Sequence, residues 1–141
     1  MSNEGERRRA ERRERADEQS AAHRRRREQE SAKAQLLVDR FVARARQQGL
    51  PTEALTARPW TGRRRYRTDV VGWYLRLDRS IGVSADGGYY VLTVPPARFG
   101  RWRRIHLEPT QPPLQVGEGA RDGESIALAA LLELRLERLS R

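Results

Sequence analysis

Two short segments combine arginine with aromatic side chains and contain no acidic residue. They cover residues 58–67 and 98–104. Arginine neutralises phosphate with a planar guanidinium that donates several hydrogen bonds, and exposed aromatic rings can stack on unpaired bases. This combination predicts a nucleic-acid surface. The candidate residues are Arg58, Trp60, Arg63, Arg64, Arg65, Tyr66, Arg67, Arg98, Arg101, Trp102, Arg103 and Arg104.

The excess of arginine also has a compositional explanation. The formal net charge is +10, and Lys33 is the one lysine among 29 basic residues. A GC-rich genome would favour arginine codons over lysine codons, so the position of the charges matters more than their number. Residues 1–33 carry eleven basic and eight acidic residues, whereas residues 34–141 carry 18 basic and 11 acidic ones. The larger share of the excess charge therefore lies outside the N-terminal segment.

Residues able to perform catalysis do not form a convincing set in the sequence. His23 precedes the region rich in apolar residues, and His106 is the other histidine of the chain. Nucleophilic catalysis needs a nucleophile, a base and an orienting group, but turns or a helix cap account for the serines and carboxylates considered. We therefore predict no enzymatic activity, cofactor or metal site. The residues considered are Ser80, Ser84, Ser125, Asp69, Asp78 and Asp86.

A glycine-rich segment at residues 116–124 precedes an apolar run and suggests a phosphate-binding loop. Its spacing, Gly117-x-Gly119-x-x-x-Gly123, does not match the dinucleotide fingerprint, and no Gly-Lys-Ser/Thr follows. Its acidic residues would repel phosphate. We interpret this segment as a structural loop.

Composition excludes several other classes of protein. The chain of 141 residues has no cysteine, which rules out disulfides and thiolate metal sites. It has neither an apolar run long enough to span a membrane nor the pattern of a secretory signal. We therefore expect a cytoplasmic protein.

The chain divides into a charged arm and one domain. All 28 Leu, Ile, Val and Phe residues lie at or after Leu36. The arm, residues 1–33, is rich in helix-forming Arg, Glu, Gln and Ala but has no apolar face to bury. We expect it to be disordered or a marginal solvated helix, and we expect residues 34–141 to form a single domain.

Two helices are predicted in the domain. Apolar residues recur with helical period over Leu37–Ala45, and Gly49 follows where a left-handed cap would end the helix. Ser125 is the expected N-cap of a second helix over residues 126–139. The Pro- and Gly-rich residues 110–124 before it predict an exposed loop.

Alternating apolar patterns predict a meander of strands between the helices. Residues 51–55 are expected to form a short turn and residues 58–67 a polar connector. Asp86-Gly87-Gly88 predicts a hairpin turn. One face of the first strand would carry Val71, Trp73, Leu75 and Leu77. The expected strands cover residues 70–77, 81–84 and 89–94, with a fourth edge strand at residues 102–107.

These elements predict an α+β fold with a small antiparallel sheet of three to four strands, flanked by an N-terminal and a C-terminal helix. A small half-open barrel is the alternative. In an up-down-up meander the two arginine segments start at opposite ends of the sheet. The chain after Pro96 can return along the sheet, so a shared surface is left open.

Four aromatic residues fall on neighbouring predicted strands, where cross-strand pairing stabilises a sheet. They are Trp73, Tyr74, Tyr89 and Tyr90. Alternation places Trp73 and Tyr74 on opposite faces. A role in the core is expected, but Tyr74 and Tyr90 would form a contact platform if they faced away from the helices.

The sequence therefore predicts a non-enzymatic basic protein that contacts nucleic acid, RNA rather than DNA, or a ribonucleoprotein, through the arginine and aromatic clusters. The alternative is an adaptor that binds another protein through the aromatic sheet face or a charged helix. The oligomeric state is left open.

Overall fold

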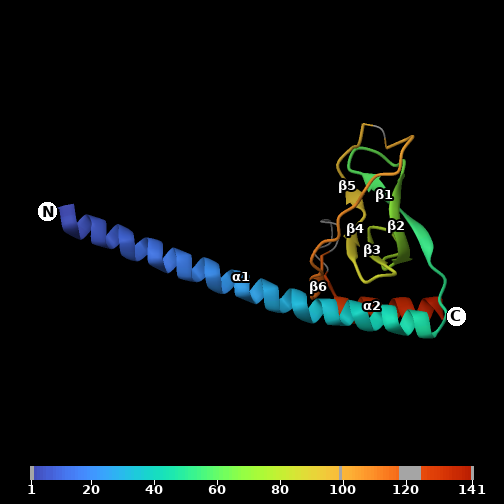
Figure 1. Cartoon of the computed structure of the whole chain (residues 1–141), viewed down its shortest axis with the longest axis horizontal. Helices are drawn as coiled ribbons and strands as arrows, with labels where there is room; N and C mark the ends of the chain where they lie inside the picture. Colours follow the sequence, from blue (N-terminus) through green and yellow to red (C-terminus); the bar gives the residue numbers. More distant parts are fainter. Residues whose placement is uncertain (1, 99, 118–124, 141) are drawn as a thin grey trace.

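The chain begins with one very long helix, and the other elements gather at the C-terminal end of that helix (Figure 1). The computed structural model describes residues 2–98, 100–117 and 125–140. Helix α1 spans Ser2–Gln47, so the expected arm and the expected first helix form one continuous element. Gly49 has φ +65° and ends it, and the Leu50 amide donates to the Ala45 carbonyl at 2.9 Å.

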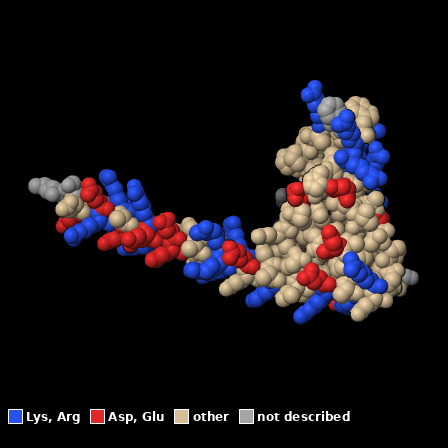
Figure 2. All heavy atoms as spheres, in the orientation of Figure 1, with Lys and Arg blue, Asp and Glu red and all other residues tan. Residues whose placement is uncertain are grey.

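The first two-thirds of α1 makes almost no contact with the domain. Residues 3–30 are exposed apart from the half-buried Ala21 and Ala22. Charges of both signs surround this part of the helix (Figure 2), and Glu11 and Arg15 form an i, i+4 ion pair at 4.0 Å. Such pairs stabilise a helix that has no apolar face.

The sheet closes upon itself. It has five strands in the order β4-β3-β2-β1-β5, of which β1 and β5 are parallel and the other pairs antiparallel. Because Leu92 alone separates β4 from β5, the two edges of the sheet belong to one run of chain. The result is a small barrel (Figure 1). Its strands are β1 Glu53–Pro59, β2 Tyr66–Tyr74, β3 Ile81–Ser84, β4 Tyr89–Val91 and β5 Thr93–Val94.

The start of the barrel differs from the sequence prediction. β1 covers part of the expected turn at residues 51–55 and the first part of the expected connector at residues 58–67. β2 begins at Tyr66 rather than Val70. β1 contains no Val or Ile and ends at a proline, so it lacks the composition typical of a strand. Pairing with β2 and β5 therefore stabilises β1 as a strand, although its residues have low strand propensity.

Two cores bury opposite faces of the sheet. The inner core fills the barrel and consists of Leu55, Ala57, Tyr66, Val70, Tyr74, Leu92 and Val94. The outer core lies between the barrel wall and the helices and includes Phe41, Trp73, Leu75, Val83, Tyr89, Leu128 and Leu132. The Phe41 and Trp73 rings meet edge to face at 5.7 Å.

The apolar face predicted for the first strand is buried only in part. Trp73 and Leu75 are buried as expected, but Val71 and Leu77 are 51% and 71% exposed. Trp73 and Tyr74 do point to opposite faces, and Tyr74 lies in the barrel interior rather than on an open platform.

The C-terminal elements also differ in detail. Helix α2, Leu128–Leu139, starts after the expected residue 126, and its N-cap is Ala127 with no side-chain hydrogen bond, so Ser125 is not the cap. Residues before it form a two-stranded sheet of β6, Gln115–Val116, and β7, Ile126–Ala127. The part of the glycine-rich segment at residues 118–124 lies outside the described residues.

Helix α2 packs beside the last turns of α1 under the barrel (Figure 1), and an ion pair joins Arg44 to Glu133. The expected edge strand at residues 102–107 is reduced to a single bridge, in which Ile105 runs parallel to Thr68. The α+β class is thus confirmed, but the sheet is mixed and larger than the predicted three or four strands.

Deletion of residues 1–30 should change the melting temperature by less than about 2 °C, because none of the side chains described in this stretch, residues 3–30, is fully buried. Calorimetry of the full chain and of the shortened chain measures this.

The control is Phe41→Ala, which removes a side chain that is 1% exposed. This change should cost about 3–5 kcal/mol. A loss of many degrees on deletion of residues 1–30 would contradict the description of the arm.

Candidate nucleic-acid interface

The two arginine segments meet at one end of the barrel. The Trp60 amide donates to the Val94 carbonyl at 3.0 Å, and the Ala97 amide donates to the Tyr66 hydroxyl at 3.3 Å. Gly100 lies against the Tyr66 ring so closely that a Cβ there would be 2.7 Å from ring carbons. These contacts hold the loop after β5 against the loop between β1 and β2.

Backbone hydrogen bonds then fix the second segment beside β2. The Ile105 amide donates to the Arg67 carbonyl at 2.8 Å, and the Asp69 amide donates to the Ile105 carbonyl at 3.2 Å. The Arg67 guanidinium also donates to the Trp102 carbonyl at 3.4 Å. The shared surface that the sequence left open is therefore present.

This end of the barrel carries a concentration of positive charge. Figure 2 shows Lys and Arg side chains gathered at the end farthest from α2. No acidic residue occurs in the chain between Glu53 and Asp69 or between Asp86 and Glu108. We call this surface the basic end. Its exposed arginines are Arg58, Arg63, Arg64, Arg67, Arg98, Arg101, Arg103 and Arg104.

Two tryptophans accompany these arginines and face solvent. Trp60 and Trp102 are each 68% exposed, an unusual state for the largest apolar side chain. The Arg101 guanidinium lies over the Trp102 ring, 6.0 Å from its centre. Exposed rings beside guanidinium groups match the requirements for stacking on bases.

Two of the predicted site residues serve the fold instead. Tyr66 is 8% exposed and belongs to the inner core, so its ring is not available for stacking. The Arg65 guanidinium donates to the carbonyls of Thr56 at 2.6 Å and Arg79 at 2.9 Å and to the Thr56 hydroxyl. Burial lowers the pKa of Arg65. We remove both residues from the candidate surface.

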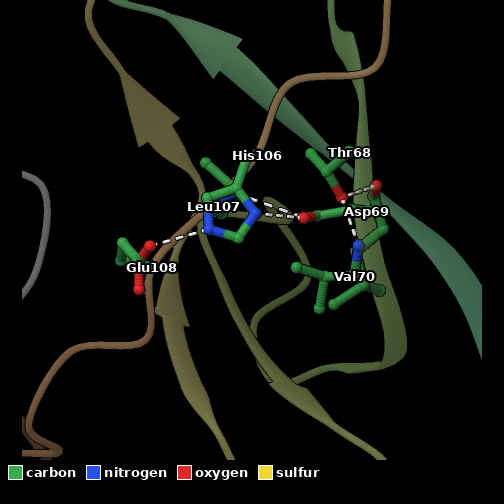
Figure 3. A network of polar contacts seen from close by, with 7 residues as sticks. Thr68, Asp69, Val70, His106, Leu107 and Glu108 are labelled. Atoms are coloured by element: carbon green, nitrogen blue, oxygen red, sulfur yellow. Dashed lines mark hydrogen bonds and ion pairs between the residues drawn. The ribbon is translucent and has the colours of Figure 1, made fainter.

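A histidine bracketed by two carboxylates holds the chain just beyond the basic end (Figure 3). His106 contacts Asp69 through Nδ1 and Glu108 through Nε2, the latter at 2.7 Å. The Leu107 amide donates to Asp69 at 3.2 Å. We call this arrangement the His106 latch, because it ties the segment that follows Arg104 to β2.

The latch shifts the ionisation of its members. Hydrogen bonds to Asp69 and Glu108 raise the pKa of His106. Burial would raise the pKa of Asp69, but the hydrogen bonds from His106 and the Leu107 amide outweigh it and lower that pKa. The charged forms of both groups are therefore favoured together.

No family model, curated protein or solved structure matches the chain. Within the described ranges, no group of three or more His, Cys, Asp or Glu residues is arranged to hold a metal ion. No helix in those ranges is both long and apolar enough to cross a membrane.

Replacing Arg65 and Arg64 one at a time tests whether Arg65 stabilises the fold while the exposed Arg64 does not. Arg65→Ala removes hydrogen bonds from a charged donor and should cost about 2 kcal/mol of stability. Arg64→Ala removes an exposed side chain and should change stability by less than about 0.5 kcal/mol. Urea unfolding of both variants measures this, and equal losses would contradict the assignment.

The His106 latch should make stability depend on pH. Because the folded pKa of His106 is raised, its contribution is complete below about pH 6.5 and is lost as the pH rises through the folded value. The Asp69 contribution is lost as the pH falls below about 4. The melting temperature of the wild type relative to His106→Asn should therefore be highest between these values. A difference that stays constant from pH 6 to pH 9 would contradict the latch.

Proposed function

We propose that the protein is a non-enzymatic nucleic-acid-binding protein that holds single-stranded RNA at the basic end of its barrel. The observation that supports this most strongly is the union of two acid-free segments, far apart in sequence, on one surface. The link between Ile105 and Arg67 brings them together.

Electrostatics supports a polyanionic ligand. Binding of phosphates by arginine releases condensed counterions, which provides most of the affinity of such surfaces. Eight arginines of the basic end are exposed, and the sequence contains no acidic residue over 54–68 or 87–107. A backbone that passes over this end would meet positive charge from both loops.

The exposed tryptophans favour unpaired bases over a duplex. Trp60 and Trp102 sit in turns, and among the described residues no helix lies at this end to enter a major groove. Proteins that recognise RNA sequence mostly bind splayed, single-stranded bases and stack aromatic rings on them. Base stacking on an aromatic ring does not depend strongly on base identity, so weak sequence preference is expected.

Salt-dependent binding of fluorescein-labelled octauridylate tests the role of the arginines. Arg63→Gln with Arg64→Gln should lower the slope of log K against log salt by about 1.4, since each phosphate contact to a single strand contributes about 0.7. The matched control, Arg135→Gln with Arg138→Gln, removes the same charge from α2 and should leave the slope nearly unchanged.

No binding at low salt, or equal effects of the two double variants, would contradict the proposal. The first result would leave the protein-binding adaptor as the remaining explanation.

Replacing the tryptophans tests stacking separately. Trp60→Ala and Trp102→Ala should each weaken binding by about 5- to 150-fold, equivalent to about 1–3 kcal/mol per stacked base. Both side chains are exposed, so melting temperatures should stay close to that of the wild type. Quenching of tryptophan fluorescence by the oligonucleotide should disappear in the double variant, because the remaining Trp73 is buried. Unchanged affinity would exclude stacking.

A further inference from the structure

A hollow of about 370 Å³ lies between α2 and the turn that follows β2. This turn is at the C-terminal end of β2, whereas the basic end is at its N-terminal end. The hollow is therefore a separate surface from the one proposed to bind RNA.

The hollow is apolar at its base and continues onto an exposed apolar rim. Leu75 and Leu131 line it and are buried, at 3% and 8% exposure. Leu77 and Leu134 also line it, but they are 71% and 45% exposed. Exposed leucines are favourable only when another apolar surface covers them. A ligand that covers them must present apolar groups.

The charges at the rim are unbalanced. Arg76, Arg135, Arg138 and Asp78 line the hollow. The Asp78 carboxylate is already engaged, because it pairs with Arg76 at 3.4 Å and accepts hydrogen bonds from the amide and hydroxyl of Ser80 at 3.0 and 2.6 Å. The guanidinium groups of Arg135 and Arg138 are then left beside the apolar base of the hollow.

One of these groups has an unsatisfied donor. Arg135 Nε is buried and has no hydrogen-bond partner among the described residues. Burial lowers the pKa of Arg135, and neighbouring Arg138 lowers it further while Glu53 opposes them. A buried donor without an acceptor is costly, and like charges add to that cost. A carboxylate at the rim of the hollow would offset the repulsion between Arg135 and Arg138.

We propose that this hollow binds a segment of a partner protein that presents leucine-sized side chains and carboxylates on one helical face. The apolar groups would cover Leu77 and Leu134, and a carboxylate would accept hydrogen bonds from Arg135 and Arg138. Docking of an amphipathic helix in a groove is a recurrent mode of peptide recognition. An acidic helix complements the charge of this rim.

The test uses the full chain and a fluorescein-labelled peptide that repeats leucine and glutamate at helical spacing. Fluorescence anisotropy measures affinity, and amide chemical shifts locate the site. Shifts are expected at residues 75–78 and 131–138. Arg135→Gln with Arg138→Gln should weaken binding about tenfold, and Leu77→Ser, a change at an exposed position, should also weaken it.

Matched controls distinguish this site from general attraction between opposite charges. Arg63→Gln with Arg64→Gln removes the same charge at the basic end and should leave affinity within about twofold. A peptide with glutamine in place of glutamate should bind more weakly.

Three outcomes would overturn the proposal. They are no binding of the acidic peptide, equal losses from the two double variants, and a dimer of the chain in sedimentation that Leu77→Ser dissociates. The last result would assign the hollow to a second copy of the chain.

Discussion

The barrel closes where the backbone of Leu92 forms hydrogen bonds to the chain on both of its sides. Its amide donates to the Ser80 carbonyl and its carbonyl accepts from the Arg58 amide, both at 2.8 Å, and its side chain is fully buried. One residue thus bonds to the strands on both sides, and closure removes free sheet edges. The closed barrel brings the chain after β5 back to the start of β2. The two arginine segments meet there through the Ala97–Tyr66 and Ile105–Arg67 hydrogen bonds.

The structure shows where the basic residues of the chain gather. The arm is the most conspicuous basic segment, but it carries nearly as many acids as bases and projects away from the domain (Figures 1 and 2). The domain instead has two separate basic surfaces with different neighbours. At the basic end, arginines accompany exposed tryptophans. Beside α2, arginines border exposed leucines. Guanidinium groups at the two places therefore suit different ligands, although the residue type is the same.

Local patterns in the sequence predicted the helices, β3 and the aromatic strand after it, because periodicity and turn residues encode these elements directly. β1 was missed because its residues Glu53–Pro59 depend on pairing partners rather than on strand composition. The candidate arginines were identified, but their separation into structural and exposed groups was not. Arg65 differs from Arg64 in its partial burial and in the acceptors supplied by Thr56 and Arg79. The His106 latch joins residues 37 positions apart, which no local pattern reveals.

We propose that both loops of the basic end form one ligand-binding surface. An amide chemical-shift titration of the full chain with unlabelled octauridylate tests it most directly. We expect residues 61–64 and 100–104 to shift together with one midpoint, while residues 131–138 of α2 do not respond. Shifts confined to one loop, different midpoints for the two loops, or a dominant response along α1 would contradict it.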